Sequence, residues 1–457
     1  MLLRRITYCW LMVLGCVRWA RADGNIASNT PPQFPRYTLQ QCIDRALAQN
    51  PDILLSKQHL EEAAGAIVEA RAGFLPSLTS YASYEKLETD YATLGGTTSN
   101  RTYIWNVNIR LTETIYSGGA VGARMAIARL QKQSRTFDFE AVVDQVIQDV
   151  RVAFYDILRN EADVAVHDQA VNFLAEQARN ERAKLDVGTG QKLNVLRAEV
   201  NLALEQSALV DSRNRLRDSY LRLSELLSIP YSIDQDQVPF DLDGALGYEK
   251  STLDLNDCLS RALIQRPELT ARENDVKVQQ RQLTVDHSEV LPHVNLFTGY
   301  DVVSEPDTTL PRDYYDGYVA GVQVDWHIFD GLATRGRMRE TRARMEAADV
   351  QLDATRRTIQ TDVVRAFRDL QRAEENIQTQ TANVQLAAES LDLATTNFGL
   401  GLTSQLELLQ SRLDLTRAQT AELSARFDYN AALARLERAM GSRFQVTETR
   451  ASAGGAR

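Results

Sequence analysis

Two kinds of hydrophobic pattern divide the chain into short strand segments and very long helical segments. In residues 101–116 and 316–329 apolar and polar side chains alternate, which places the apolar ones on one face of a strand and the polar ones on the other. Two further strands are predicted at about residues 75–88 and 291–304, each just before its alternating partner along the chain. Each half of the chain therefore contributes one β-hairpin, and the whole chain contributes four strands.

The alternating strands have the length and the end residues of membrane-spanning strands. They are about a dozen residues long, which exceeds the usual strand and suffices for a tilted crossing of a bilayer. The aromatic residues expected to face lipid are Tyr103, Trp105, Tyr318 and Trp326. The polar residues expected to line a lumen are Asn106, Asn108, Arg110, Gln323, Asp325 and His327. A soluble sandwich also alternates, but charged residues in mid-strand and aromatic residues at strand ends favour a membrane barrel.

Four strands are too few to close a barrel. An open sheet edge in lipid leaves backbone groups without hydrogen bonds, at a cost of several kcal/mol for each group. The sequence therefore predicts that the chain forms an oligomer in which further copies supply the missing strands.

The rest of the chain has the pattern of long coiled-coil helices. From residue 119 to about 186, and from 331 to about 397, there is no proline and almost no glycine, which corresponds to about 100 Å of helix in each half. Apolar residues recur at alternating steps of four and three, the spacing of a coiled-coil seam. One predicted seam comprises Val143, Ile147, Val150, Phe154 and Ile157, and the other comprises Leu406, Leu409, Leu413, Thr416, Thr420, Leu423 and Phe427. Glycine-containing turns at 186–190 and 397–404 reverse the chain, so that 119–228 and 331–441 are predicted to be helical hairpins.

The chain is internally duplicated. "CIDRALAQNP" at 42–51 is nearly repeated as "CLSRALIQRP" at 258–267, and the likeness continues through the strands and the long helices. The predicted repeats span 23–228 and 252–441, which is the size of a domain rather than of a solenoid unit. Residues 229–251, with Pro, Gly and Asp, form the linker, and 442–457 form a tail.

The N-terminus has the layout of a secretory signal. Arg4 and Arg5 precede a short apolar run, and "ARA" at 20–22 suits cleavage after residue 22. The alternative is a lipoprotein signal in which Cys16 carries the lipid. Cys42 and Cys258 occupy the same place in the two repeats, and we expect two buried apolar side chains there rather than a disulfide bond.

Charge and motifs exclude several functional classes. The chain carries a net charge of −10, and loss of residues 1–22, which contain four arginines and no acidic residue, lowers it to −14. An acidic exported chain is a poor nucleic-acid binder. The five histidines show no metal-ligand spacing, and the sequence contains no phosphate loop and no nucleophile motif. We expect no enzymatic activity, no cofactor and no metal site.

Several of these features resemble the TolC family of bacterial outer-membrane efflux channels. They are the "RALxxNP"-type helix ends, the "LP" pairs before strands, "IYSGG" and "IFDG" after strands, and the long coiled coils with glycine tips, all present twice. The resemblance implies a homotrimer in the outer membrane whose twelve strands close a barrel, continuous with a hollow helical cylinder in the periplasm. It also implies two partners, a periplasmic adaptor protein and an inner-membrane pump. It leaves open whether the exported substrate is a drug, a metal ion or a protein.

The same resemblance assigns roles to residues near the hairpin tips. Glu407 falls where family members place an acidic ring that narrows the pore, and its match in the first half is Asn194. Gln410 occupies the place of a second acidic ring, and Thr403 that of a basic gate residue, so the expected gate is less charged than in other members. The residues implied in adaptor docking are Gly188, Thr189, Gly401 and Leu402.

A different class of protein also fits part of the sequence. A periplasmic coiled-coil scaffold without a pore would explain the secretion signal and the long helices. It would not explain four alternating segments of membrane-spanning length, and the channel is therefore the preferred interpretation.

Overall fold

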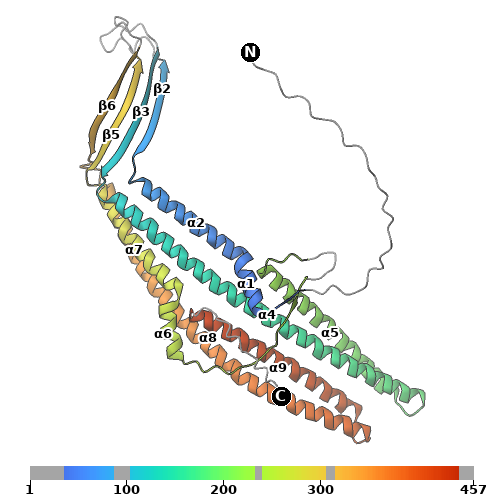
Figure 1. Cartoon of the computed structure of the whole chain (residues 1–457). Coiled ribbons are helices and arrows are strands. Elements are labelled where there is room, and N and C mark those ends of the chain that lie inside the picture. The colour runs from blue at the N-terminus through green and yellow to red at the C-terminus, as the bar shows by residue number, and fades with distance from the viewer. Residues whose placement is uncertain (1–34, 87–102, 232–238, 305–313, 442–457) are drawn as a thin grey trace, which may run out of the picture.

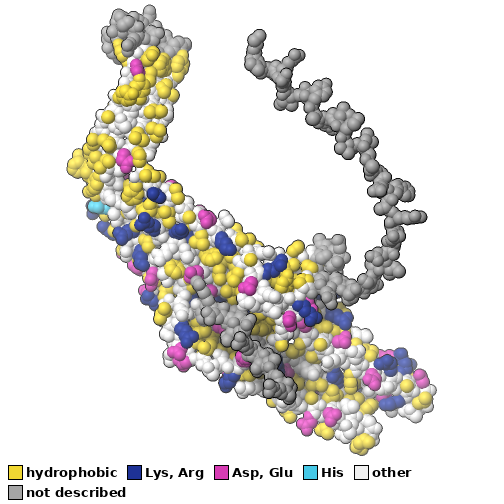
Figure 2. Space-filling model, in the orientation of Figure 1, with side chains coloured by type: hydrophobic (Ala, Val, Ile, Leu, Met, Phe, Trp, Pro, Cys, Tyr) yellow, Lys and Arg dark blue, Asp and Glu magenta, His cyan; other side chains and the backbone are white. Residues whose placement is uncertain are grey.

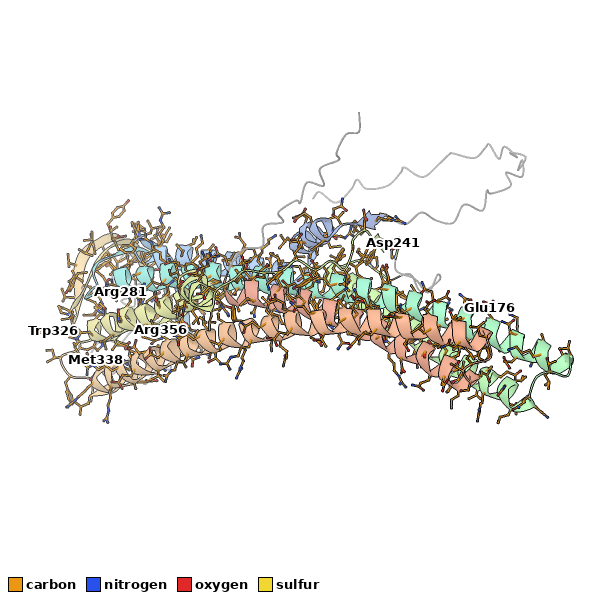
Figure 3. The ribbon with its side chains drawn as sticks, turned by 90° about the horizontal axis from the view of Figure 1, so that it is seen from below. Glu176, Asp241, Arg281, Trp326, Met338 and Arg356 are labelled. Carbon is orange, nitrogen blue, oxygen red and sulfur yellow. The ribbon has the colours of Figure 1, made fainter. Side chains whose placement is uncertain are left out.

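A computed structural model describes residues 35–86, 103–231, 239–304 and 314–441 as an elongated molecule with a curved sheet at one end and two helical hairpins at the other (Figure 1). The helices lie along one another from the sheet to the hairpin tips, with Trp326 at the sheet end and Glu176 towards the tips (Figure 3). The predicted signal at 1–22, the tail at 442–457 and most of both strand-connecting loops lie outside the described residues.

The sheet contains β2 (Ser77–Lys86), β3 (Tyr103–Tyr116), β5 (His293–Ser304) and β6 (Tyr314–Asp325). Its order is β2-β3-β5-β6, and every neighbouring pair is antiparallel. The central pair joins the two halves of the chain, because β3 comes from the first half and β5 from the second. Strands β2 and β6 form the two edges, each with one side unpaired within the described chain.

The last strand ends earlier than the sequence pattern predicts. It stops at Asp325, which pairs with His293, the first residue of β5. The residue before His293 is Pro292, which has no N–H to offer a partner strand. The prediction that Trp326 and His327 belong to this strand is therefore wrong. The Trp326 indole instead donates a hydrogen bond to the carbonyl of Val290, at 3.1 Å.

The helices occur in the same order and with the same lengths in both halves. In the first half they are α1 (Leu39–Gln49), α2 (Pro51–Ala72), α4 (Ala120–Asp186) and α5 (Lys192–Leu226), with 11, 22, 67 and 35 residues. In the second half they are α6 (Leu255–Gln265), α7 (Pro267–Ser288), α8 (Ala333–Gly399) and α9 (Gln405–Ala439), again with 11, 22, 67 and 35 residues. Among the described helices, none combines the length and the low polarity needed to cross a bilayer.

Local signals fix the ends of the short helices. Thr38 caps α1 through a capping box with Gln41, and the Asp254 side chain accepts hydrogen bonds at the start of α6. Proline at the first position of α2 and of α7 begins a new helix directly after the previous one. Cys42 and Cys258 are buried and unbonded, which confirms the expected buried side chains and excludes a disulfide between them. Burial raises the pKa of Cys42 to about 12, so that its thiol stays protonated.

The core consists of one coiled-coil seam in each half. The predicted seam on α4 is confirmed, because Val150, Phe154 and Ile157 are buried and pack with α1 and α5 residues. The seam between α8 and α9 also shows alternating steps of four and three. It comprises Ile359, Val363, Ala366, Leu370, Ala373 and Ile377 on α8, and Ala425, Tyr429, Ala432, Leu436 and Ala439 on α9.

The stripe predicted as the α9 seam does not face α8. Leu406, its first member, is 58% exposed, and Phe427, its last, packs against the Arg159 guanidinium of α4 at 4.7 Å. Helix α9 contacts both α8 and α4, so it needs two apolar faces. The prediction identified the wrong one as the hairpin seam.

Leu223 and Leu221 on α5 provide a matched test of this core, because Leu223 is fully buried and Leu221 is 39% exposed. We expect Leu223→Ala to lower the free energy of unfolding by about 2–5 kcal/mol through lost apolar burial and a residual cavity. Leu221→Ala should cost less than about 1 kcal/mol, because the side chain lies at the surface and its removal leaves no enclosed cavity. Thermal unfolding followed by circular dichroism at 222 nm measures both. Equal losses for the two variants would contradict the assigned packing of α5.

Candidate functional site: sheet faces, helical shafts and hairpin tips

One face of the sheet is apolar and open. Its exposed side chains include Leu78, Tyr84, Val107, Ile109, Leu111, Leu296, Tyr318, Val322 and Val324, and apolar atoms dominate this end of the molecule in Figure 2. Tyr318 is 91% exposed and packs edge-on against Tyr300, while Trp105 lies 6.3 Å from the ring of Tyr314. The Tyr103 backbone pairs with Lys86, and its side chain is not among the described ones. An open apolar surface of this extent is typical of a surface that contacts a membrane or a partner.

The opposite face carries Arg110, whose side chain lies across the neighbouring strand. Arg110 stands opposite Gly299, which leaves room for the guanidinium to lie across β5 between Phe297 and Asp301. The guanidinium is 5.2 Å from the Phe297 ring and 3.9 Å from the Asp301 carboxylate. A side chain at Gly299 would strike the Ile109 carbonyl, because an added Cβ would lie 2.5 Å from that oxygen.

The other predicted lumen residues that belong to strands share this face. Asn108 pairs with Asp301, Asn106 with Val303 and Gln323 with Asn295, and the Gln323 amide donates to the Asp325 carboxylate at 3.0 Å. The register thus places five of the six predicted lumen residues on one face, with His327 beyond the strand. That they line a lumen stays a prediction.

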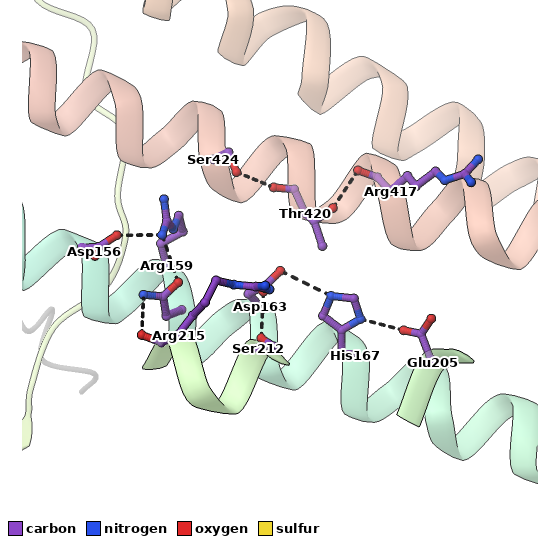
Figure 4. Close-up of polar contacts among 11 residues, drawn as sticks. Asp156, Arg159, Asp163, His167, Glu205, Ser212, Arg215, Arg417, Thr420 and Ser424 are labelled. Carbon is purple, nitrogen blue, oxygen red and sulfur yellow. Dashed lines mark hydrogen bonds and ion pairs between the residues drawn. The ribbon is translucent and has the colours of Figure 1, made fainter. Parts of the chain in front are cut away.

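A buried polar cluster fixes the register of α4 against α5 (Figure 4). His167 on α4 lies 2.7 Å from the Glu205 carboxylate of α5 and 3.8 Å from Asp163. Ser212 and Arg215 of α5 both donate to Asp163 at 2.8 Å. Because each group has a partner on the facing helix, a shift of one turn would break all these contacts. Among the described residues no set of three or more metal-ligand side chains is grouped for an ion.

Side-chain contacts join the helical shafts of the two halves. Arg151 of α4 pairs with Glu437 of α9, and Arg159 stacks on Phe427. Near the tips, Arg412 of α9 lies 5.4 Å from the ring of Phe173 on α4. Burial lowers the pKa of Arg412, and the Glu205 carboxylate partly offsets that effect. None of these pairs could be found from a local sequence pattern, because the partners lie hundreds of residues apart.

The hairpin tips are open turns built on glycine. Gly188 and Gly401 have φ of +81° and +76°, and no atom lies near the position of an added Cβ at either one. The following residues close the turns, since the Thr189 N–H donates to Lys184 and the Leu402 N–H donates to Asn397. Leu402 is 73% exposed, so the structure leaves the predicted docking residues accessible at the end of the molecule.

The four predicted gate residues do not contact one another within one chain. Glu407 is exposed and accepts from the Ser404 N–H in a capping box, and exposed Gln410 donates to Asp414 of its own helix. Thr403 is half-buried, and no partner is recorded for its hydroxyl oxygen. The structure brings Asn194 together with Gln405 instead, because the buried Gln405 amide donates to the Asn194 carbonyl at 3.1 Å. Sequence reasoning missed Gln405, as it missed the Lys184 ammonium stacked on Phe398 at 4.7 Å.

A sequence model of the family described as "Outer membrane efflux protein" matches residues 42–228 and, separately, 258–442. The chain belongs to this family. The efflux protein is 21% identical to the outer membrane efflux protein BepC of Brucella suis biovar 1 over 72% of this chain and 69% of that protein. It is 25% identical to the proteases secretion protein PrtF of Dickeya chrysanthemi over 70% of each.

Solved structures share the fold of the efflux protein. The Campylobacter jejuni CmeC outer membrane channel matches with a TM-score of 0.79 at 17% identity, covering 90% of this chain and 87% of that one. VceC of Vibrio cholerae matches with a TM-score of 0.75 at 17% identity, covering 89% of this chain and 97% of that one. The expected resemblance to outer-membrane efflux channels and the expected outer-membrane location are therefore confirmed.

The contact between the two tips of the efflux protein is testable with two glutamines of α9. Gln405→Ala removes the hydrogen bond to the Asn194 carbonyl, whereas Gln410→Ala removes a contact within α9 alone. A net hydrogen bond contributes about 1 kcal/mol, so Gln405→Ala should speed amide exchange at both tip turns by about fivefold. Hydrogen–deuterium exchange of residues 184–194 and 397–405 measures this. An equal effect of Gln410→Ala would contradict a specific contact between the tips.

Proposed function

We propose that three copies of this chain form a passive exit duct that carries substrates across the periplasm and the outer membrane. The observation that supports it most directly is the antiparallel four-stranded sheet with one open apolar face, continuous with two helical hairpins of equal length. Efflux and protein secretion relatives share the family, so the duct is common to several kinds of substrate. The substrate is chosen by the inner-membrane pump and the adaptor that deliver it.

The sheet edges favour closure with other copies. Strands β2 and β6 each present unpaired N–H and C=O groups, and lipid offers these groups no hydrogen bonds. Pairing β6 of one copy with β2 of the next preserves the antiparallel order, and three copies then give twelve strands. The apolar face would meet lipid, and the face with Arg110 and Asp301 would line the lumen.

The helices carry matching apolar rows that have no partner within the described chain. On α5 the row is Leu193, Leu196 and Val200, and on α8 it is Leu386 and Leu393, continued by the C-cap residue Leu400, all about half exposed or more. Both rows follow coiled-coil spacing, with steps of three and four on α5 and of seven on α8. We assign these rows to contacts between neighbouring copies, where α5 of one packs against α8 of the next. Because the chain is internally duplicated, each copy would supply two similar helical hairpins, and three copies would form a ring of six hairpins.

The gate is assigned to the tip region. Three copies of Glu407 would approach one another on the threefold axis, where their mutual repulsion would be balanced by attracted cations. Because the Glu407 side chain also accepts from Ser404 in the α9 capping box, Glu407→Gln is the informative variant: glutamine preserves the capping box and removes the charge.

Single-channel conductance in planar bilayers tests the duct and its gate together. We expect the wild type to pass a small, cation-preferring current, and Glu407→Gln to lose about half or more of that preference as the ring loses its charge. Asp414→Asn, on the same helix but farther from the turn, is the charge-matched control and should change little. A cation preference that survives Glu407→Gln would move the gate elsewhere. Confirmed insertion without any current would favour the non-pore scaffold.

Adaptor docking at the tips is testable through Leu402. Leu402→Asn removes an exposed apolar side chain from the turn and leaves the left-handed Gly401 in place. We expect adaptor binding to weaken about tenfold, the cost of one lost apolar contact of 1–2 kcal/mol, while trimer yield and conductance stay unchanged. The control is Ile264→Asn, since Ile264 is 81% exposed on α6 and distant from the tips. Full binding by Leu402→Asn would remove the tip from the docking surface.

A further inference from the structure

Residues 239–251, which we call the strap, cross from the first half of the chain to the second and are bonded to both helical hairpins. At the second-half end, three side chains of α9 hold the strap backbone. Asn430 donates to the Gly247 carbonyl at 3.0 Å, Tyr429 donates to the Glu249 carbonyl, and Arg426 donates to the Leu246 carbonyl. The Ser251 N–H returns a hydrogen bond to the Tyr429 hydroxyl at 3.0 Å.

The first-half end of the strap is packed onto α4 and α5. Phe240 is buried and its ring lies 5.6 Å from that of Tyr220 on α5. Gly244 lies flush on Phe154 of α4, since an added Cβ would come within 2.9 Å of that ring. Between these apolar contacts, Asp241 of β4 (Asp241–Leu242) reaches the Tyr220 hydroxyl. Figure 3 shows Asp241 beside the shaft, on the strap side of the molecule.

The Tyr220 hydroxyl stands between two carboxylates. Its oxygen lies 2.6 Å from Glu161 of α4 and 3.2 Å from Asp241 of the strap. A hydroxyl has one hydrogen to donate, so with both carboxylates ionised it can make only one full hydrogen bond. The two carboxylates then also repel each other across it. A proton on Glu161 changes the arrangement, because Glu161 can donate to the Tyr220 oxygen while Tyr220 donates to Asp241.

We propose that the strap is a proton-sensitive tie between the two helical hairpins, in which protonation of Glu161 completes a hydrogen-bond chain through Tyr220 to Asp241. Acid then tightens the tie and limits how far the α8/α9 hairpin can move from the α4/α5 hairpin. Neutral pH loosens it. The second-half end is held by other groups: α9 side chains bond its backbone carbonyls, the Tyr429 hydroxyl accepts from it, and Lys250 pairs with Glu374 of α8 at 2.9 Å. None of these bonds includes Glu161 or Tyr220.

Several charged groups surround this triad. From β1 (Arg36–Tyr37), Arg36 pairs with Asp241 at 3.3 Å. From α1, Arg45 donates to the Tyr37 hydroxyl and to the Leu227 carbonyl. On α5, Arg217 stands one turn before Tyr220, and on α4, Arg159 pairs with Asp156.

The direction of the effect follows from the protons bound. Burial raises the pKa of Glu161 and the nearby Asp241 carboxylate raises it further, although the Tyr220 hydrogen bond opposes both. The folded tie therefore binds this proton more tightly than the released tie does. By linkage, the stability of the tie is highest in acid and falls as pH rises from the ordinary glutamate pKa through the raised value.

Hydrogen–deuterium exchange of the detergent-purified protein at pH 5 and pH 7.5, corrected for intrinsic exchange chemistry, tests the tie. We expect the wild-type amides of residues 241–243 to be about fivefold better protected at pH 5, the effect of one additional hydrogen bond. The amides of residues 247–251 should show no such difference. Equal protection of 241–243 at the two pH values would overturn the proposal.

Two variants distinguish the effect of the Glu161 proton on amide protection from the effect of strap packing. Glu161→Gln can donate at any pH, so it should give high protection at both pH values. Tyr220→Phe breaks the chain and should give low protection at both. Glu176→Gln, at an exposed position of α4 nearer the tips, should behave as the wild type. A pH response that persists in Glu161→Gln would also overturn the proposal. These readouts need no current, so they are independent of whether the chain forms a pore.

Discussion

The unpaired edges of the four-stranded sheet are the constraint on which the rest of the architecture depends. A β-hairpin pair with one apolar face and two open edges has no stable place in water or in lipid as a single copy. In the proposed assembly these edges pair between copies. The two helices of 67 residues, α4 and α8, are joined through shorter helices, because α7 packs on both of them and α9 also contacts both.

Two kinds of contact hold the long helices together. Apolar seams hold each hairpin together, and side-chain contacts between the α4/α5 and α8/α9 hairpins include Arg151–Glu437, Arg159–Phe427 and Lys184–Phe398. Close-packed seams resist displacement, whereas charged side chains can exchange partners and water at small cost. The two halves are also joined by the pairing of β3 with β5 and by the packing of α7 on α4.

Local signals explain how much of the fold could be predicted from the sequence. Pro51 and Pro267 begin helices, and Gly188 and Gly401 supply the left-handed turns, so the helix limits and the tips follow from single residues. The end of β6 does not follow, because Pro292 on the neighbouring segment decides it. The α9 seam was misassigned because α9 has two apolar faces and its sequence does not say which one meets α8. Gln405, Arg412 and the His167 cluster depend on segments that meet only in the folded chain, and no local pattern reveals them.

The pairing of β3 with β5 has a consequence for the order in which the molecule forms. The hydrogen bond from the Trp105 N–H to the Ser304 side chain joins residues 199 positions apart, with the whole α4/α5 hairpin lying between them. Local hairpins close in microseconds, but contacts of such separation come late because a long loop must be ordered first. The β2–β3 hairpin must therefore wait with its apolar face uncovered while the first shaft, the strap and α7 take shape. During this interval the open apolar face makes the chain most prone to aggregation.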